Sequence, residues 1–128
     1  MQQVFLIALG GSLGAVARYG VATWIYQQTG TSFPWGTFII NVTGSFAIGF
    51  LAELFETALV PGGWRSFLTI GFLGAYTTFS TFTLETFNLL REGELRLATG
   101  NILLSTVAGL FAVVLGIYSF RLLTRLVH

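Results

Sequence analysis

The stretch Gly71-Phe-Leu-Gly-Ala-Tyr-Thr-Thr-Phe-Ser-Thr-Phe82 decides the fold, because it places glycines and a row of serine and threonine hydroxyls inside an apolar segment. The surrounding run from Phe67 to Leu84 carries no charge, and its length approaches the roughly 20 residues that a helix needs to cross a bilayer. Hydrocarbon supplies no hydrogen bonds, so irregular backbone persists at membrane depth only where protein buries it or where it lines a cavity. The stretch therefore indicates a site inside a membrane span.

The composition places the whole chain in a membrane. Of the 128 residues, 54% are hydrophobic and only 9% are charged, and the mean hydropathy is +0.80, which is too apolar for a soluble domain. Two further charge-free runs, Tyr19 to Ala52 and Leu97 to Phe120, locate the other spans. We predict an all-α membrane protein with a single domain over residues 1–128 and four transmembrane helices, at about residues 4–26, 35–55, 67–90 and 97–123.

The glycines and hydroxyls of the third span have two explanations. Small residues let neighbouring helices approach closely, and hydroxyls can bond back to carbonyls of the preceding turn. Alternatively, the helix is interrupted near its middle. Four hydroxyls within five positions (Thr77, Thr78, Ser80 and Thr81), directly after two glycines, favour the interruption. A break would free backbone carbonyls for a small cation and turn a helix N-terminus toward an anion.

Aromatic rings follow the hydroxyls. Phe79 and Phe82 are three residues apart, so a helix would place them on one face, with Glu85 on the same face a turn further on. They are either packing rings or the lining of an anion path, because the edge of an aromatic ring is electrically positive. The sequence leaves both readings open.

Polar residues inside the other spans add candidates. The amide of Asn41 in the second span must bond either to a neighbouring helix or to a permeating species. In the fourth span, Asn101 and Ser105 fall at helical spacing and could extend a polar track, although packing by Ser105 is equally consistent. Arg18 lies deep in the first span, where it is either an anion-gathering vestibule charge or an interfacial anchor.

Several classes of function are excluded by what the chain lacks. It contains no cysteine, its one histidine is His128, and no Ser/His/Asp constellation or nucleotide motif is present, so we expect no enzyme. The net charge of +1 gives no reason to expect a nucleic-acid partner. The arginines near the span ends are nearly balanced between the two sides of the membrane: one side would hold Arg65, Arg121 and Arg125, and the other Arg91 and Arg96. This balance allows insertion in both orientations, with pairing of opposite copies. It equally allows a fixed topology with a small bias.

Three groups of residues resemble the Fluc family of microbial fluoride channels over nearly the whole chain. They are residues 14–18, residues 36–37 with 41–44, and above all Gly71 to Gly74 running into the Thr-Thr-Phe-Ser-Thr-Phe string. The resemblance implies a passive channel that lets fluoride leave the cytoplasm through the bacterial inner membrane. It also implies an antiparallel homodimer of dual-topology subunits with two pores and a structural sodium ion at the centre.

The resemblance assigns roles to individual residues. The sodium ligands would be the backbone carbonyls of Gly74 and Thr77, contributed by both subunits. The fluoride pathway would be formed by the rings of Phe79 and Phe82, the amide of Asn41 between them, Thr78 and Ser105. Arg18 and Glu85 would be vestibule or structural charges.

Two other classes remain as alternatives. A small proton-coupled exporter of cationic compounds would also use four helices and a dual-topology dimer, but it needs a carboxylate deep in the membrane, and Glu85 is the one candidate. A non-transporting subunit of a larger membrane complex would account for the glycines but not for the run of hydroxyls.

Overall fold

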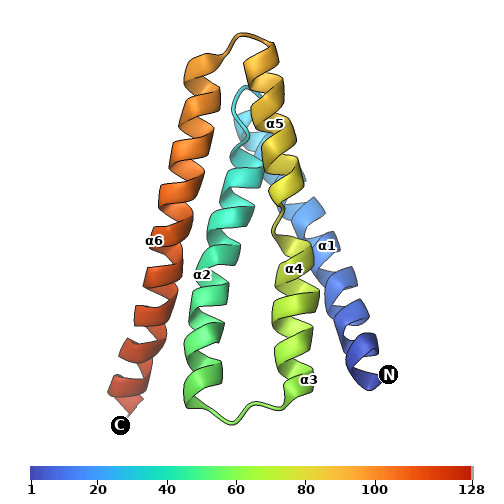
Figure 1. Ribbon diagram of the computed structural model, residues 1–128, viewed down its shortest axis with the longest axis vertical. Helices are drawn as coiled ribbons and strands as arrows, with labels where there is room; N and C mark the ends of the chain where they lie inside the picture. The colour runs from blue at the N-terminus through green and yellow to red at the C-terminus, as the bar shows by residue number, and fades with distance from the viewer. Residues whose placement is uncertain (128) are drawn as a thin grey trace.

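The computed structural model describes residues 1–127, which form helices joined by short connections (Figure 1). The third span is built from four consecutive helical pieces, whereas each of the other spans is one helix. In chain order the elements are α1 (Gln2–Thr29), α2 (Trp35–Thr57), α3 (Gly62–Arg65), the π-helix η1 (Ser66–Leu73), α4 (Gly74–Tyr76), α5 (Phe79–Arg91) and α6 (Leu95–Val127).

The four predicted spans are confirmed within the described residues. The helices α1, α2 and α6 and the composite segment Gly62–Arg91 are each long and apolar enough to cross a membrane. Most of the helices extend a few residues beyond the predicted limits. Charge-free runs mark only the part that lies in hydrocarbon, while helical hydrogen bonding continues into the polar flanks.

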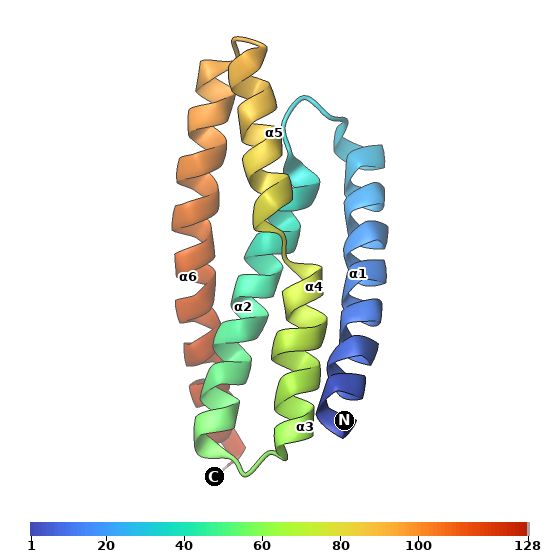
Figure 2. The ribbon, with the colours of Figure 1, turned by 45° about the vertical axis from the view of Figure 1, so that its right-hand side comes forward.

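The spans run alternately up and down, so both chain ends lie at the same end of the molecule (Figure 1). The helix α2 packs along α6 over much of its length, and α1 packs against the first half of the third span. Figure 2 shows the two halves of that span, α3 to α4 and then α5, meeting at a non-helical link near mid-height. The break therefore lies in the interior of the span.

Glycines permit the tightest helix contacts. On α1, a Cβ at Gly14 would collide with the carbonyl oxygen of Phe72 in the π-helix. On α6, a Cβ at Gly116 would collide with the carbonyl oxygen of Phe46 on α2. Backbones can approach this closely only where one partner lacks a side chain. These contacts fix α1 and α6 on the other helices.

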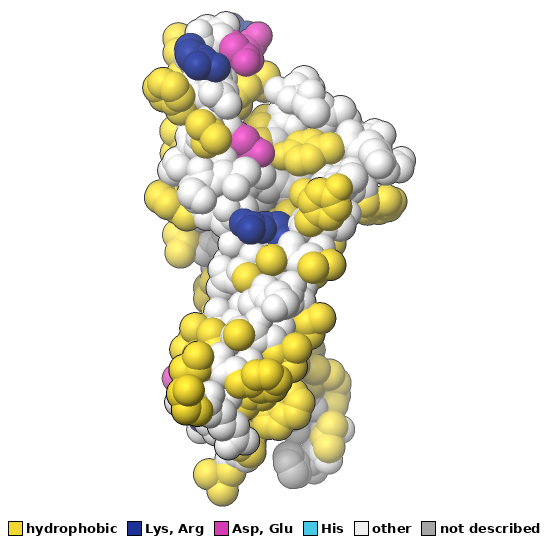
Figure 3. Space-filling model, turned by 90° about the vertical axis from the view of Figure 1, so that its right-hand side faces the viewer, with side chains coloured by type: hydrophobic (Ala, Val, Ile, Leu, Met, Phe, Trp, Pro, Cys, Tyr) yellow, Lys and Arg dark blue, Asp and Glu magenta, His cyan; other side chains and the backbone are white. Residues whose placement is uncertain are grey.

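The outer surface suits a lipid environment. Large apolar side chains are exposed along the helices, among them Val16 at 70% and Leu110 at 67%. Yellow apolar side chains extend from one end to the other of the face in Figure 3, with charged groups at the upper end and around mid-height. Near the end of the bundle that holds the termini, Arg121 Nε donates to Glu53 Oε1 at 2.7 Å. The two opposite charges neutralise each other locally at this end of the bundle.

Candidate functional site

The third span is interrupted where the hydroxyl-rich stretch begins, as predicted. The helix α4 ends at Tyr76, and Thr77 (φ −77°, ψ 155°) and Thr78 (φ −149°, ψ 112°) are extended. The helix resumes as α5 at Phe79. Two residues of extended backbone therefore stand at membrane depth.

Asn41 on α2 holds the break in place. Its Oδ1 accepts a hydrogen bond from the backbone N–H of Thr78 at 2.8 Å, and its Nδ2 donates to the carbonyl of Thr78 at 3.1 Å. The sequence allowed this amide to bond either to a neighbouring helix or to a permeating species, and in the structure it bonds to the third span. A carboxamide has two N–H donors, so one remains for another acceptor.

The break removes the helical donors of the carbonyls of Gly74 and Thr77, among others. In a continuous helix, the N–H of Thr78 would bond to Gly74 and the N–H of Thr81 would bond to Thr77. Here Thr78 N donates to Asn41 Oδ1, and Thr81 N donates to Thr78 Oγ1 at 3.3 Å. The carbonyls of Gly74 and Thr77, the predicted cation ligands, are thus released from the helical pattern.

The second half-helix starts at the break with its own cap. The side chain of Thr78 caps α5, and its hydroxyl also donates to Thr81 Oγ1 at 2.9 Å. Because α5 is 13 residues long, its N-terminus carries the partial positive charge of the helix dipole. The break therefore combines released carbonyls on one side with a positive helix end on the other.

One pocket, called the main pocket below, is lined by every residue assigned to the ion pathway and to the cation. It has a volume of about 470 Å³ and lies between α2, the broken span and α6. Its lining includes Asn41, Gly74, Thr77, Thr78, Phe79, Phe82 and Ser105. Residues from three different spans, far apart in sequence, meet around the break.

The walls of this pocket are neutral. The rings of Phe79 and Phe82 lie 5.9 Å apart between centroids, at 43° to each other, and Phe79 is 77% exposed. On the wall formed by α2, a Cβ at Gly44 would collide with the Thr77 side chain, so glycine is what admits that threonine. The pocket thus offers hydroxyl, amide and aromatic groups without a full charge.

The predicted position of Glu85 is wrong. The sequence placed it on the face of Phe79 and Phe82, but its Oε1 accepts hydrogen bonds from Tyr26 at 3.0 Å and Thr37 at 2.9 Å, and it does not line the main pocket. Six residues turn a helix by about 600°, which is about 120° short of two full turns. Glu85 therefore faces α1 and α2.

Asn101 also differs from expectation. It is 1% exposed and lies behind Ser105, outside the lining of the pocket. Its Oδ1 accepts a hydrogen bond from Ser105 Oγ at 3.2 Å. The polar track predicted along α6 therefore reaches the pocket through Ser105 but not through Asn101.

The two charges that the sequence singled out share a second, smaller pocket. Arg18 and Glu85 both line a space of about 300 Å³ that also touches Thr78 and Tyr26. Neither charge lines the main pocket. Sequence reasoning missed Tyr26 and Thr37 as the partners of Glu85, because the three residues lie on different spans and no local pattern links them.

The fold defines a multi-pass membrane protein, and the family that it matches is one of transport proteins, not enzymes. The model of a family described as CrcB-like protein, Camphor Resistance (CrcB), matches residues 5–117. The chain belongs to this family, and the resemblance found in the sequence is confirmed.

Curated relatives carry a common name. A protein of Geotalea uraniireducens named Fluoride-specific ion channel FluC is 48% identical over 118 residues, covering 91% of this chain and 95% of the relative. Relatives of the same name from Citrifermentans bemidjiense and Geobacter metallireducens are 47% and 48% identical. They align with 96% and 94% of this chain, and with 100% and 98% of their own length.

Proposed function

We propose that this protein is a fluoride-selective channel that lets fluoride leave the cytoplasm passively. The observation that carries the proposal is the pocket at the helix break, where Asn41, Phe79, Phe82 and Ser105 meet. The relatives named Fluoride-specific ion channel FluC, which match nearly the full length of the chain, support the choice of ion.

The chemistry of the pocket suits a small, strongly hydrated anion. A pore must replace the water around fluoride with several donors and still release the ion. The free N–H of Asn41, the N-terminus of α5 and the ring edges of Phe79 and Phe82 provide neutral or partial positive charge. The full charges of Arg18 and Glu85 lie at the second pocket, where they cannot trap an ion against these rings.

We further propose that two copies pair in antiparallel orientation, giving two pores in a bacterial inner membrane. Thr43, Ser80 and Thr83 are exposed at mid-span in the single chain, with the hydroxyls of Thr43 and Thr83 also bonded to carbonyls of their own helices. Small polar residues in membrane helices favour contact with another helix over lipid. The balanced arginines permit both orientations. Fluoride that enters a cell as neutral HF ionises in the more alkaline cytoplasm, so a passive exit at this membrane would lower its concentration.

A structural sodium ion fits the donors at the break. The carbonyls of Gly74 and Thr77 are released from helical bonding and border the pocket. Among residues 1–127, no cluster of three or more histidine, aspartate or glutamate residues could hold a metal. A site of neutral backbone oxygens suits a monovalent cation, as at the unwound helices of transporters. Bound there, sodium would stabilise the extended backbone electrostatically.

Liposomes that contain the purified protein should release trapped fluoride when a potassium ionophore dissipates the membrane potential, because a channel needs no coupling ion. A fluoride electrode outside the liposomes measures the release, and liposomes loaded with chloride are the control for selectivity. Release that requires a proton gradient would instead support the proton-coupled exporter of cationic compounds. Retention of fluoride under both conditions would contradict the proposed function.

Replacing sodium by a large organic cation throughout purification and assay should lower fluoride release or dissociate the dimer, because the released carbonyls would lose their cation. Size-exclusion chromatography reports the assembly, and the fluoride electrode reports the flux. Returning sodium should restore both. If the protein behaves identically without sodium, Gly74 and Thr77 do not bind it.

A further inference from the structure

Two walls of the main pocket are connected by a series of three hydrogen bonds, of which the central one is buried. Ser105 Oγ on α6 donates to Asn101 Oδ1 at 3.2 Å, and Asn101 Nδ2 donates to Thr86 Oγ1 on α5 at 2.9 Å. Thr86 Oγ1 in turn donates to the carbonyl of Phe82 at 2.8 Å. The series thus begins and ends on residues that line the pocket, Ser105 and Phe82.

The two middle members do not touch the pocket. Asn101 is 1% exposed and Thr86 is 7% exposed, and neither lines the cavity. A buried amide that is bonded at both its nitrogen and its oxygen is held in one orientation, because leaving either end unpaired costs about 1–3 kcal/mol. Their effect on the pocket must therefore pass through Ser105 and Phe82.

The direction of donation along these three hydrogen bonds requires a carboxamide at position 101. Thr86 has one hydroxyl proton, which it gives to the carbonyl of Phe82, so its oxygen needs a donor. The proton of Ser105 needs an acceptor on the other side. Among side chains of this size, only a carboxamide presents a donor at one end and an acceptor at the other without charge.

We infer that Asn101, held by Thr86, is a positioning residue that fixes the hydroxyl of Ser105 at the pocket wall, opposite the ring of Phe82. Without Asn101, the Ser105 hydroxyl turns to the carbonyl four residues earlier on its own helix, the usual partner of a helical serine. The Ser105 oxygen then leaves the pocket wall. While Asn101 holds that oxygen at the wall, its one proton can rotate about the Cβ–Oγ bond from Asn101 Oδ1 to a passing fluoride. This inference rests on the proposed function, since it concerns the path that fluoride takes.

The test is a double-mutant cycle in liposome fluoride efflux. Ser105→Ala and Asn101→Leu should each lower the flux by about fivefold, the effect of one net hydrogen bond. The double variant should be no slower than either single variant, because Asn101 acts only through Ser105. If the two losses multiply, or if Ser105→Ala has no effect, the inference is overturned.

Thr86 provides the matched control. Thr86→Val keeps the shape but removes the acceptor of Asn101, and it should slow efflux by a few-fold; Thr86→Ser keeps the hydroxyl and should restore the flux. A role of Thr86 in helix packing alone would give the opposite order, with valine the better substitute. Thermal unfolding of each variant separates loss of fold from loss of positioning. Failure of the wild-type protein to release fluoride would count against the proposed function, whereas multiplying losses in an active channel count against this inference alone.

Discussion

Asn41→Leu is expected to reduce fluoride efflux by about two orders of magnitude. The substitution leaves both the N–H and the carbonyl of Thr78 without the partners they have at 2.8 and 3.1 Å. Each unsatisfied backbone group costs about 1–3 kcal/mol, so the extended segment loses its preference over other backbone conformations. The same change removes the free N–H that the pocket offers to an anion.

Asn88→Leu is a suitable control for this variant. Asn88 lies on α5 and lines a different pocket, beside Glu85 and Glu92, so the same chemical change there leaves the break intact. Its flux should stay within about twofold of wild type, as expected for a change away from the site. If Asn41→Leu conducts as well as Asn88→Leu, the amide neither holds the break nor meets the ion.

Phe82→Ile should lower fluoride efflux at least tenfold while leaving the assembly intact. Isoleucine keeps an apolar side chain of similar volume but has no ring edge, and the pairing of Phe82 with Phe79 at 5.9 Å is lost. A positive ring edge is a weak donor to an anion, and isoleucine offers nothing in its place. Efflux from liposomes and size-exclusion chromatography measure the two properties.

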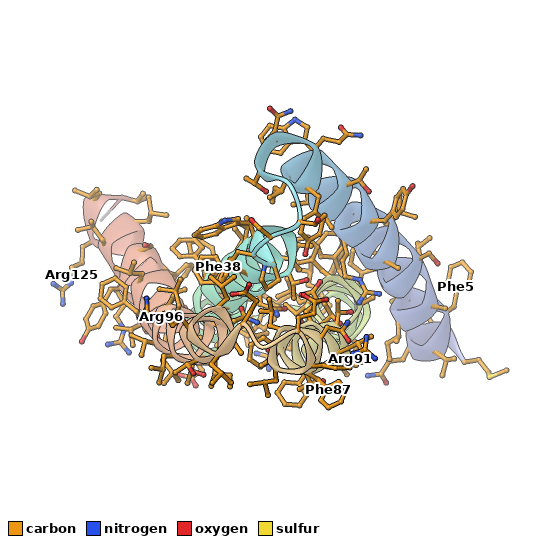
Figure 4. The ribbon with its side chains drawn as sticks, turned by 90° about the horizontal axis from the view of Figure 1, so that it is seen from above. Phe5, Phe38, Phe87, Arg91, Arg96 and Arg125 are labelled. Atoms are coloured by element: carbon orange, nitrogen blue, oxygen red, sulfur yellow. The ribbon has the colours of Figure 1, made fainter. Side chains whose placement is uncertain are left out.

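Phe87→Ile is the matched control for the ring. Phe87 is on the same helix, is 57% exposed and projects from the outer side of α5, away from α2 (Figure 4). Replacing Phe87 removes an aromatic ring that does not line the main pocket, so the flux should stay near wild type. Equal fluxes for the variants at positions 82 and 87 would remove the ring-edge mechanism.

The four spans and the site of the break could be predicted because both depend on local composition. Apolar length fixes the spans, and glycines followed by hydroxyls within a single helix predict an interruption. A bond from Asn41 to a neighbouring helix was one of two options that the sequence allowed, and its partner Thr78 was not predicted. Choosing between the two options required the distance between α2 and the third span, which no local pattern contains.

Other features were not predictable. The π-helix Ser66–Leu73 has no sequence signature; it packs against α1, where a Cβ at Gly71 would come within 2.7 Å of the carbonyl oxygen of Ile7. The position of Glu85 was wrong because a spacing of three residues, repeated, drifts around a helix that turns every 3.6 residues. The sequence allowed Asn101 to extend a polar track with Ser105, because spacing gives a face of the helix but not the depth of a side chain behind its neighbour.

The halves of the third span have different neighbours. The first half packs on α1, whereas α5 packs on α6. A tilt of α1 relative to α6 would therefore be absorbed at Thr77 and Thr78, the two extended residues between the half-helices. Such a movement would change the spacing of the released carbonyls of Gly74 and Thr77, so the geometry of the proposed cation site depends on how the two outer helices are held.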